Sequence, residues 1–183
     1  MNHIGTQYIE TDHLILRRFE LSDAPAMFAN WASDDEVTRF LTWPTHTDVS
    51  VTERILGEWI PQYKQEDCYR WAITLKDNGS QPIGSIDVCH WREDGEAPEI
   101  GYCMGKRWWH RGIMSEALGA VIDFLFDQVG VERVVARHDV NNPHSGGVMR
   151  KCGMKFEEIR EKNNRNNQGE CDCACYAIHR SNR

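Results

Sequence analysis

Two kinds of hydrophobic spacing alternate along this chain, and together they predict which segments are strands and which are helices. Strand-like patterns occupy residues 13–19, 71–75, 83–91, 99–104, 131–138 and 174–178. Helical spacing occupies 24–31 and 49–63, with Ser22 as the expected cap of the first helix. The clearest helix places Met114, Ala117, Leu118, Val121 and Leu125 on one apolar face. A short helix over 145–151 is expected to end before Gly153.

The order of these elements predicts the fold class. One strand is followed by two helices, three strands, a helix, a strand, a helix and two further strands. Turns at 77–79 and 93–96 indicate hairpins in the first half, and a strand-helix-strand unit follows. We therefore expect an α/β fold with a mixed, mostly antiparallel sheet of about seven strands and about four flanking helices. No repeat or linker interrupts the chain, so 1–183 is predicted to be a single domain.

Charge and hydropathy exclude several classes of protein. The chain carries 21 Lys and Arg against 28 Asp and Glu, a net charge of −7, which argues against a nucleic-acid partner. This balance is compatible with a cationic acceptor, although an acidic surface is most often a matter of solubility. The N-terminus has no signal-peptide pattern, and no apolar run approaches the roughly 18–20 residues of a membrane span.

The cysteines favour a reducing compartment. Seven is an odd number without a disulfide-framework spacing, so reduced thiols in the cytoplasm are expected. Cys171, Cys173 and Cys175 alternate and line one face of the last strand. A fourth ligand at suitable spacing is missing, so we interpret them as small buried thiols and expect no metal.

A strand, a turn and a helix start follow one another directly between Glu99 and Leu118. The first backbone N–H groups of a helix are unpaired, and the helix dipole adds positive potential, so this point suits a pyrophosphate. Gly112 lets the backbone approach a phosphate, and Arg111 adds a charge. A plain strand-to-helix turn is the alternative interpretation, and one glycine does not decide between them.

The same segment resembles motif A of the GNAT acetyltransferase superfamily, most closely that of its RimJ/RimL-type branch. The resemblance rests on Trp109, His110, Arg111 and Gly112, followed by Ser115-Glu116-Ala117. Two more segments, 11–17 and 142–154, are similar to segments of that branch. All three segments occur in the same order along the chain as in that branch. Met114 is bulkier than the usual residue at its position, and its side chain is expected to join the apolar helix face.

The resemblance implies a GNAT-like fold, acetyl-CoA as cosubstrate and acetyl transfer to a primary amine. In the family, a splayed pair of parallel strands exposes a backbone amide to the thioester oxygen, and pantetheine pairs like an added strand. Carried over, the thioester lies near Tyr102, Cys103 and Met104, and Asn142 helps hold pantetheine. The implied cosubstrate-binding residues are Tyr102, Cys103, Met104, Trp109, His110, Arg111, Gly112, Ile113, Met114, Ser115 and Asn142.

Two residues are candidates for the proton transfers. Ser145 resembles the hydroxyl that protonates the departing sulfur, and a helix-start serine is the alternative. Glu99 is the candidate general base, acting through a water, because it lies on the strand beside the thioester. A solvated edge carboxylate is the alternative, and His138 is the rival base.

The acceptor is predicted to be the α-amine of a protein or peptide, as in the ribosomal-protein acetyltransferases that the chain resembles. A small amine (polyamine, amino acid or amino sugar) and a catalytically silent CoA-binding module are the alternatives. Residues 24–63 are expected to wall the acceptor cleft and carry Asp34, Asp35, Glu36 and Asp48. The tryptophans are expected in the core or in that wall. A monomer or a homodimer is expected, with no nucleic acid or membrane bound.

Overall fold

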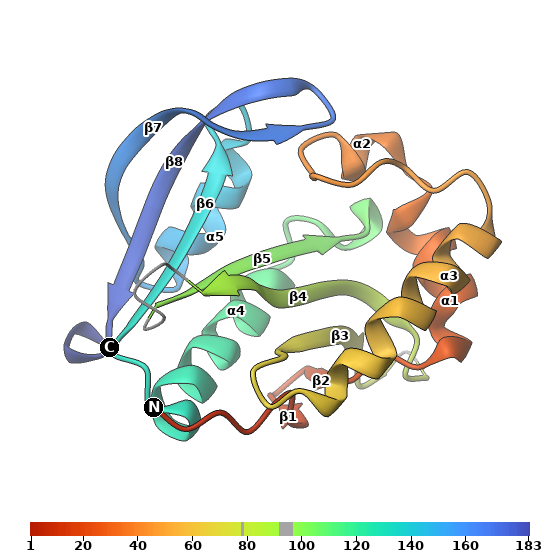
Figure 1. Cartoon of the computed structure of the whole chain (residues 1–183), viewed down its shortest axis with the longest axis horizontal. Coiled ribbons are helices and arrows are strands. Elements are labelled where there is room, and N and C mark those ends of the chain that lie inside the picture. The colour runs from red at the N-terminus through yellow and green to blue at the C-terminus, as the bar shows by residue number, and fades with distance from the viewer. Residues whose placement is uncertain (78, 92–96) are drawn as a thin grey trace.

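A single eight-stranded sheet organises the computed structural model, which describes residues 1–77, 79–91 and 97–183. The strands follow the order β1-β2-β3-β4-β5-β6-β8-β7 across the sheet (Figure 1). Their bounds are Ile9–Glu10 for β1, Leu14–Arg17 for β2, Arg70–Leu75 for β3, Pro82–Trp91 for β4, Pro98–Met104 for β5, Arg133–Asp139 for β6, Lys155–Asn166 for β7 and Gly169–His179 for β8.

The helices lie on the two faces of this sheet. They are α1 at Ala24–Met27, α2 at Asp35–Thr38, α3 at Val49–Trp59, α4 at Ile113–Phe124 and α5 at Pro143–Lys151. Irregular helical turns extend several of them, at Leu21–Asp23 and Phe28–Ala32 around α1, at Ile60–Lys64 after α3 and at Leu125–Val129 after α4.

Two hydrophobic clusters hold the layers together. The larger packs the apolar face of α4, with Leu118 and Val121, against the sheet. The smaller joins Trp31 and Leu56 to Ala72 of β3 on the opposite face. Large apolar side chains buried on both faces account for most of the stabilisation of such a layered fold.

The sheet changes character between β5 and β6. Every other neighbouring pair is antiparallel, whereas β5 and β6 are parallel and share one register pair among the described residues, Glu99 with Val135. Beyond that pair the backbone groups of β5 that face β6 have no ladder partner. The strands therefore diverge within the sheet, and this is where a cleft opens.

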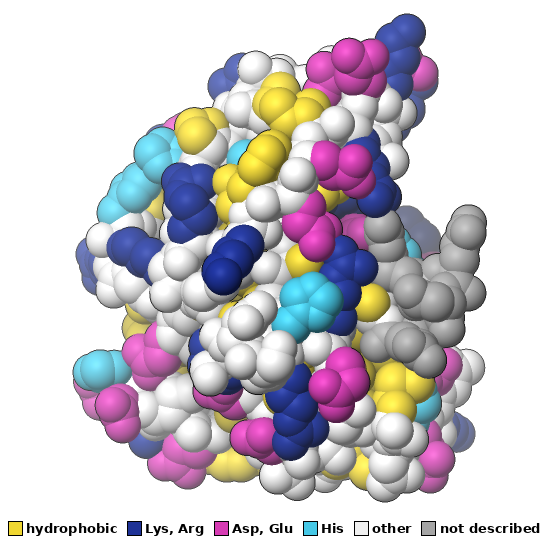
Figure 2. Space-filling view, turned by 90° about the vertical axis from the view of Figure 1, so that its left-hand side faces the viewer, with side chains coloured by type: hydrophobic (Ala, Val, Ile, Leu, Met, Phe, Trp, Pro, Cys, Tyr) yellow, Lys and Arg dark blue, Asp and Glu magenta, His cyan; other side chains and the backbone are white. Residues whose placement is uncertain are grey.

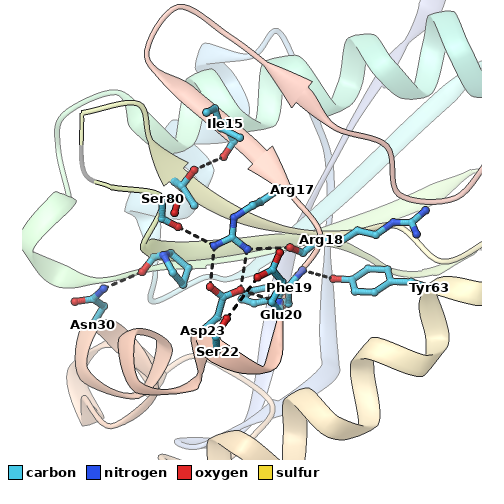
Figure 3. A network of polar contacts seen from close by, with 12 residues as sticks. Ile15, Arg17, Arg18, Phe19, Glu20, Ser22, Asp23, Asn30, Tyr63 and Ser80 are labelled. Carbon is cyan, nitrogen blue, oxygen red and sulfur yellow. Dashed lines mark hydrogen bonds and ion pairs between the residues drawn. The ribbon is translucent and has the colours of Figure 1, made fainter.

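A polar network fastens α1 to the edge of the sheet (Figure 3). Arg17 at the end of β2 binds both carboxylate oxygens of Asp23 at 2.8 and 2.7 Å and also the Ser80 carbonyl at 2.7 Å. The Glu20 N–H donates to Asp23, and the Phe19 N–H donates to the Tyr63 hydroxyl beyond α3. The network fixes α1 and the turn after α3, and Trp59 at the end of α3 lines the cleft.

A second polar connection joins the two halves of the molecule at the turn between β7 and β8. The Asn167 side-chain amide donates to the carbonyls of Thr38 and Trp43 at 2.9 and 2.8 Å, and its backbone N–H donates to Leu41. Figure 1 shows this hairpin tip beside α2. We call this set of contacts the Asn167 bridge.

One outer face of the molecule combines charged and apolar side chains. Acidic and basic side chains are interspersed across the face that Figure 2 shows, and hydrophobic side chains gather in its upper part. On β7, Phe156 and Ile159 are more than half exposed. Within the described ranges, no helix is long and apolar enough to cross a membrane.

The predicted elements are largely confirmed, with five corrections. The strand β1 and the helix α2 were missed, and β8 begins earlier than expected, at Gly169. Ser22 is not the helix cap, because Glu20 occupies the N-cap position of the turn that leads into α1. The helix predicted over 49–63 changes to a 3-10 turn after Trp59. The predicted turn at 93–96, and Asn78 of the other predicted turn, lie outside the described residues.

Candidate active site

A cleft of about 1260 Å³ runs along the divergence of β5 and β6. All the predicted cosubstrate-binding and proton-transfer residues line it, and so does the rival base His138. Residues that are distant in sequence are thus collected in one place. They come from the end of β5, the start of α4, the end of β6 and the start of α5.

The start of α4 has the geometry expected of an anion site. Gly112 is the N-cap residue with φ +79°, and no side chain caps the helix. A Cβ added to Gly112 would meet no atom within 4 Å, so open space adjoins this backbone. His110 also has a positive φ, of +61°, which is uncommon for a residue with a side chain. The N–H groups of Ile113, Met114 and Ser115 precede the first helical hydrogen bonds and are available to a ligand.

Two predicted cosubstrate residues also have structural roles. The Trp109 indole N–H donates to the Met104 carbonyl at 2.7 Å and ties the turn to the end of β5. Met114 is buried in the larger hydrophobic cluster. Its side chain thus joins the apolar helix face as predicted, and the bulk of Met114 does not obstruct the helix start.

Ser145 and Tyr102 form a reciprocal pair across the cleft. The Ser145 hydroxyl donates to the Tyr102 hydroxyl at 3.0 Å, and the Tyr102 hydroxyl donates to the Ser145 carbonyl at 2.9 Å. Burial raises the pKa of Tyr102, so this phenol is neutral near pH 7. Since Asn142 is the N-cap residue of α5, Ser145 does not cap the helix. Ser145 is still the third residue of α5, so the alternative interpretation as a helix-start serine stays open.

Asn142 lies at the start of α5 with an available side chain. Its backbone N–H donates to the Asp139 carbonyl at 2.7 Å, and this fixes the residue. Among the described residues the Asn142 side-chain amide makes no hydrogen bond, and it lines the cleft. A free amide at this point fits the predicted contact with pantetheine.

Glu99 is buried and contacts two basic side chains. Arg137 Nε lies 2.8 Å from Glu99 Oε1, and His90 Nε2 lies 3.2 Å from Glu99 Oε2. The His90 side chain is 44% exposed, so the pair reaches from the cleft to solvent. The alternative of a solvated edge carboxylate is wrong, because only 5% of Glu99 is exposed.

His138 is less well placed to act as the base. Its Nδ1 donates to the Asp139 carbonyl at 2.7 Å, which leaves Nε2 as the nitrogen with the free lone pair. This Nε2 is buried without a hydrogen-bonding partner and packs against Gly146. Burial, the largest cause, lowers the pKa of His138. The free lone pair thus faces α5, away from a path to solvent.

Part of the segment predicted to wall the acceptor cleft lines this cleft, between Glu36 and Trp43 and at Trp59. Among the predicted acids, Glu36 lines the cleft and pairs with Lys106. Asp34 and Asp48 instead cap α2 and α3, and neither they nor Asp35 reach the cleft. The tryptophans divide as expected, Trp31 and Trp108 in the core and Trp43, Trp59 and Trp109 along the cleft.

Several cleft residues were missed from the sequence. Asp87 and His90 come from β4, Arg70 from β3 and Arg137 from β6. Asp87 lies between the apolar residues Ile86 and Val88 of β4, and that pattern was the available signal. Cys171, Cys173 and Cys175 are buried free thiols, as predicted. Of these three, Cys173 lines the cleft.

Comparison with protein families and sequences gives consistent results. A family model described as an acetyltransferase (GNAT) domain matches residues 13–155. YoaA of Bacillus subtilis, an uncharacterized N-acetyltransferase, is 28% identical over 170 residues, 93% of this chain and 95% of YoaA. The uncharacterized N-acetyltransferase p20 of Bacillus licheniformis is 32% identical, covering 81% of this chain and 83% of p20. The ribosomal protein uS5-alanine N-acetyltransferase of Escherichia coli is 28% identical over 74 residues, 40% of this chain and 34% of that enzyme.

Solved structures share the fold. RimL, a ribosomal L7/L12 α-N-protein acetyltransferase in complex with coenzyme A, aligns with a TM-score of 0.83 and 21% identity. That alignment covers 94% of this chain and 98% of RimL. The microcin C7 self-immunity acetyltransferase MccE, in complex with acetyl-CoA and AMP, aligns with a TM-score of 0.81 and 19% identity, over 92% of this chain and 93% of MccE.

Proposed function

This chain belongs to the GNAT acetyltransferase family, and we propose that it acetylates the α-amine of a protein or peptide N-terminus. Its general activity follows from the family: it is an N-acetyltransferase that uses acetyl-CoA. The observation that best supports the reaction in this cleft is the divergence of β5 from β6 beside the uncapped start of α4.

The residues present fit the cosubstrate. The space above Gly112 and the free N–H groups of Ile113, Met114 and Ser115 suit the pyrophosphate. The unpaired edge of β5 around Tyr102, Cys103 and Met104 suits the pantetheine and the thioester oxygen. Asn142 offers a free amide from the opposite side of the cleft.

Ser145 is the proposed proton donor to the sulfur. Acetyl transfer forms a C–N bond, breaks the C–S bond and leaves a thiolate that takes up one proton. Tyr102 holds the Ser145 hydroxyl in place and is buried and neutral. Burial also raises the pKa of Cys103 to about 11, so this thiol is protonated near pH 7. A protonated thiol is a poor nucleophile, which favours direct attack by the amine over an acyl-cysteine step.

Glu99 remains the proposed general base, the group that takes up the amine proton. A water between the amine and the carboxylate would pass the proton to Glu99, and His90 would carry it to solvent. Arg137 orients Glu99, and a carboxylate is by its chemistry a modest base compared with an amine. A modest base suits an acceptor that loses its proton easily.

That requirement supports an α-amine. At pH 7 roughly one α-amine in seven is neutral, against about one lysine in a few thousand. The difference of about 2.5 pKa units corresponds to about 3.5 kcal/mol that a lysine-directed site has to supply. The similarity to the uS5-alanine enzyme of Escherichia coli points the same way.

A pair of peptides tests the acceptor. One has a free α-amine and blocked lysines, and its counterpart has a blocked α-amine and a free lysine. We expect faster release of free CoA with the first peptide. Faster acetylation of the second, or of a polyamine over both, would overturn the α-amine proposal, and turnover of no amine would favour a silent CoA-binding module.

A small amine is the second candidate. The Asn167 bridge connects the wall at 38–43 to the β7–β8 turn, beside the cleft-lining residues Leu41 and Asn166. This enclosure favours narrow acceptors, whether free molecules or extended N-termini. Spermidine, an amino acid amide and an aminoglycoside in the same assay separate these classes. A cytoplasmic location and a monomeric or homodimeric state stay predictions.

A further inference from the structure

One carboxylate in the cleft differs from the others because no described residue donates a hydrogen bond to it. Among the described residues, the acids that line the cleft are Glu36, Asp87, Glu99 and Asp139. Lys106 pairs with Glu36, Arg137 with Glu99, and Asn141 and Asn166 donate to Asp139. Asp87 accepts no hydrogen bond within the described ranges, and the nearest cation, Arg70 Nε, is 3.7 Å from its Oδ2. A poorly satisfied polar group in a native site requires an explanation.

Arg70 is held in its position by other residues. Its guanidinium lies over the Trp59 ring, 4.3 Å from the centroid, and its Nη1 donates to Gln62 at 3.2 Å. The Nε atom is buried and has no hydrogen-bonding partner, so the contact with Asp87 is an ion pair without a hydrogen bond. Arg70 therefore offsets only part of the cost of the Asp87 charge.

The strand register turns Asp87 toward the cleft. It lies opposite Arg70 on β3 and opposite Gly101 on β5. Gly101 has no side chain, and a Cβ there would clash with Cys89 Sγ and lie 3.8 Å from Asp87 Oδ1, so the side chains of Cys89 and Asp87 take up the space beside it. Both side chains line the cleft. Two residues further along β5 lies Cys103, beside the predicted thioester position.

Within the described part of the chain, the other titratable groups around Asp87 do not supply a second positive charge. They are the thiols of Cys68 before β3, Cys89 on β4 and Cys103 on β5. Burial raises the pKa of Asp87 to about 6, against the lowering influence of Arg70. At neutral pH the side chain is thus an incompletely neutralised carboxylate within the cleft.

We propose that Asp87 binds the amino group of the acceptor and aims its nitrogen at the acetyl carbon. The proposal rests on the proposed function, because it requires an amine as the acceptor. The carboxylate accepts N–H hydrogen bonds from a primary amine or ammonium. An alcohol of the same shape matches this acceptor less well. The proton that the ammonium loses before attack leaves through Glu99 and His90, and Asp87 keeps none.

Steady-state kinetics of Asp87→Asn test this role. The acceptor is the amine that the wild-type protein turns over fastest in the screen above. We expect the KM for the amine to rise at least tenfold, while the KM for acetyl-CoA and the Kd for CoA stay within twofold. Asp87→Glu keeps the charge and is expected to recover part of the loss. Asp123→Asn, which removes a carboxylate paired with Arg183 far from the cleft, is the matched control.

The pH dependence provides a readout that a purely structural role would not change. In the wild-type protein the KM for the amine should rise as pH falls through about 6, because Asp87 becomes protonated. The variant Asp87→Asn should lack this dependence. An unchanged KM for the amine, or an equal loss of affinity for CoA, would overturn the role of Asp87.

The two proposals can fail separately. If a polyamine proves the better acceptor and Asp87→Asn weakens its binding, the α-amine proposal fails and the role of Asp87 stands. If an α-amine peptide is the best acceptor and the variant binds it normally, only Asp87 is refuted. Turnover of no amine refutes both. Should Asp87→Asn fold poorly, Asp87→Ser gives the same comparison.

Discussion

Ser145 and Tyr102 bind each other twice, hydroxyl to hydroxyl at 3.0 Å and hydroxyl to backbone carbonyl at 2.9 Å. The second bond fixes the start of α5 relative to β5, and the first directs the serine proton. Because the serine donates to a neutral phenol, its lone pairs remain for other partners in the cleft. The pair thus sets the position of the proposed donor, and the serine hydroxyl has to rotate from Tyr102 toward the sulfur to transfer its proton.

Removal of the Ser145 hydroxyl should slow the chemical step more than binding. We expect Ser145→Ala to lower kcat about 10- to 100-fold and to change the KM for acetyl-CoA by less than threefold, since the proton is needed as the sulfur departs. Tyr102→Phe keeps the serine but removes its partner, and a smaller loss is expected. A rise in KM alone after Ser145→Ala would make Ser145 a binding residue.

A negative charge at the start of α4 should oppose phosphate binding. We expect Gly112→Asp to weaken CoA binding at least tenfold more than Gly112→Asn does, as measured by calorimetric titration. Both side chains tolerate the left-handed backbone of Gly112 better than most, and a Cβ meets no atom within 4 Å, so the fold should persist. Equal affinities of the two variants would refute the phosphate site.

Loss of the Glu99 carboxylate should change the pH–rate profile. Glu99→Gln is expected to lower kcat and to shift the acidic limb of the profile if the amine proton leaves through Glu99. His90→Ala tests the exit to solvent, and a partial loss is expected. If Glu99→Gln lowers the melting temperature but keeps the shape and height of the profile, Glu99 serves only to hold Arg137.

The negative charge of Asp87 should lower the free energy of unfolding at neutral pH. Its pKa is raised from 3.8 to about 6 on folding, so the folded state binds this proton more tightly than the unfolded chain. The stabilisation that the folded state gains by binding this proton is fully present below pH 4 and is lost as pH rises through 6. We expect Asp87→Asn to be more stable than the wild-type protein at pH 8 by about 1–2 kcal/mol, or about 3 to 6 °C.

Thermal unfolding at pH 8, 5 and 4 measures this effect. The difference should shrink at pH 5 and vanish near pH 4. A variant less stable than the wild-type protein at pH 8 would mean that the Arg70 ion pair outweighs the burial of the carboxylate. A gain in stability combined with a loss of acceptor binding is typical of a residue retained for function.

The parts of the site that the sequence predicted are those built from local pattern. The turn from β5 into α4 and the helix α5 are continuous segments, in which glycine, periodicity and the family resemblance combine within about 20 residues. The burial of Met114 followed from helical spacing, and the burial of the three alternating cysteines followed from the alternation of a strand. Local rules therefore sufficed for the cosubstrate side of the cleft.

The acceptor side could not be predicted in the same way, because tertiary packing creates it. Asp87 meets Arg70 and Gly101 only through strand register, and Ser145 meets Tyr102 across 43 positions of sequence. The helix α2 has four residues and β1 has two, which is too short for a periodic signal. Ser22 was preferred as the cap on residue type, but the helical turn begins at Leu21, so the N-cap position lies two residues earlier, at Glu20.

The single backbone pair between β5 and β6 also has a consequence for hydrogen–deuterium exchange. Amide protons of β5 that point toward β4 are locked in an antiparallel ladder, whereas those beyond Glu99 that point toward β6 have no acceptor there. Alternate amides of one strand should thus exchange at very different rates. A molecule lying along the open edge would slow the fast set and leave the slow set unchanged. Deuterium uptake at β5 therefore reports on occupancy of the cleft without any knowledge of the acceptor.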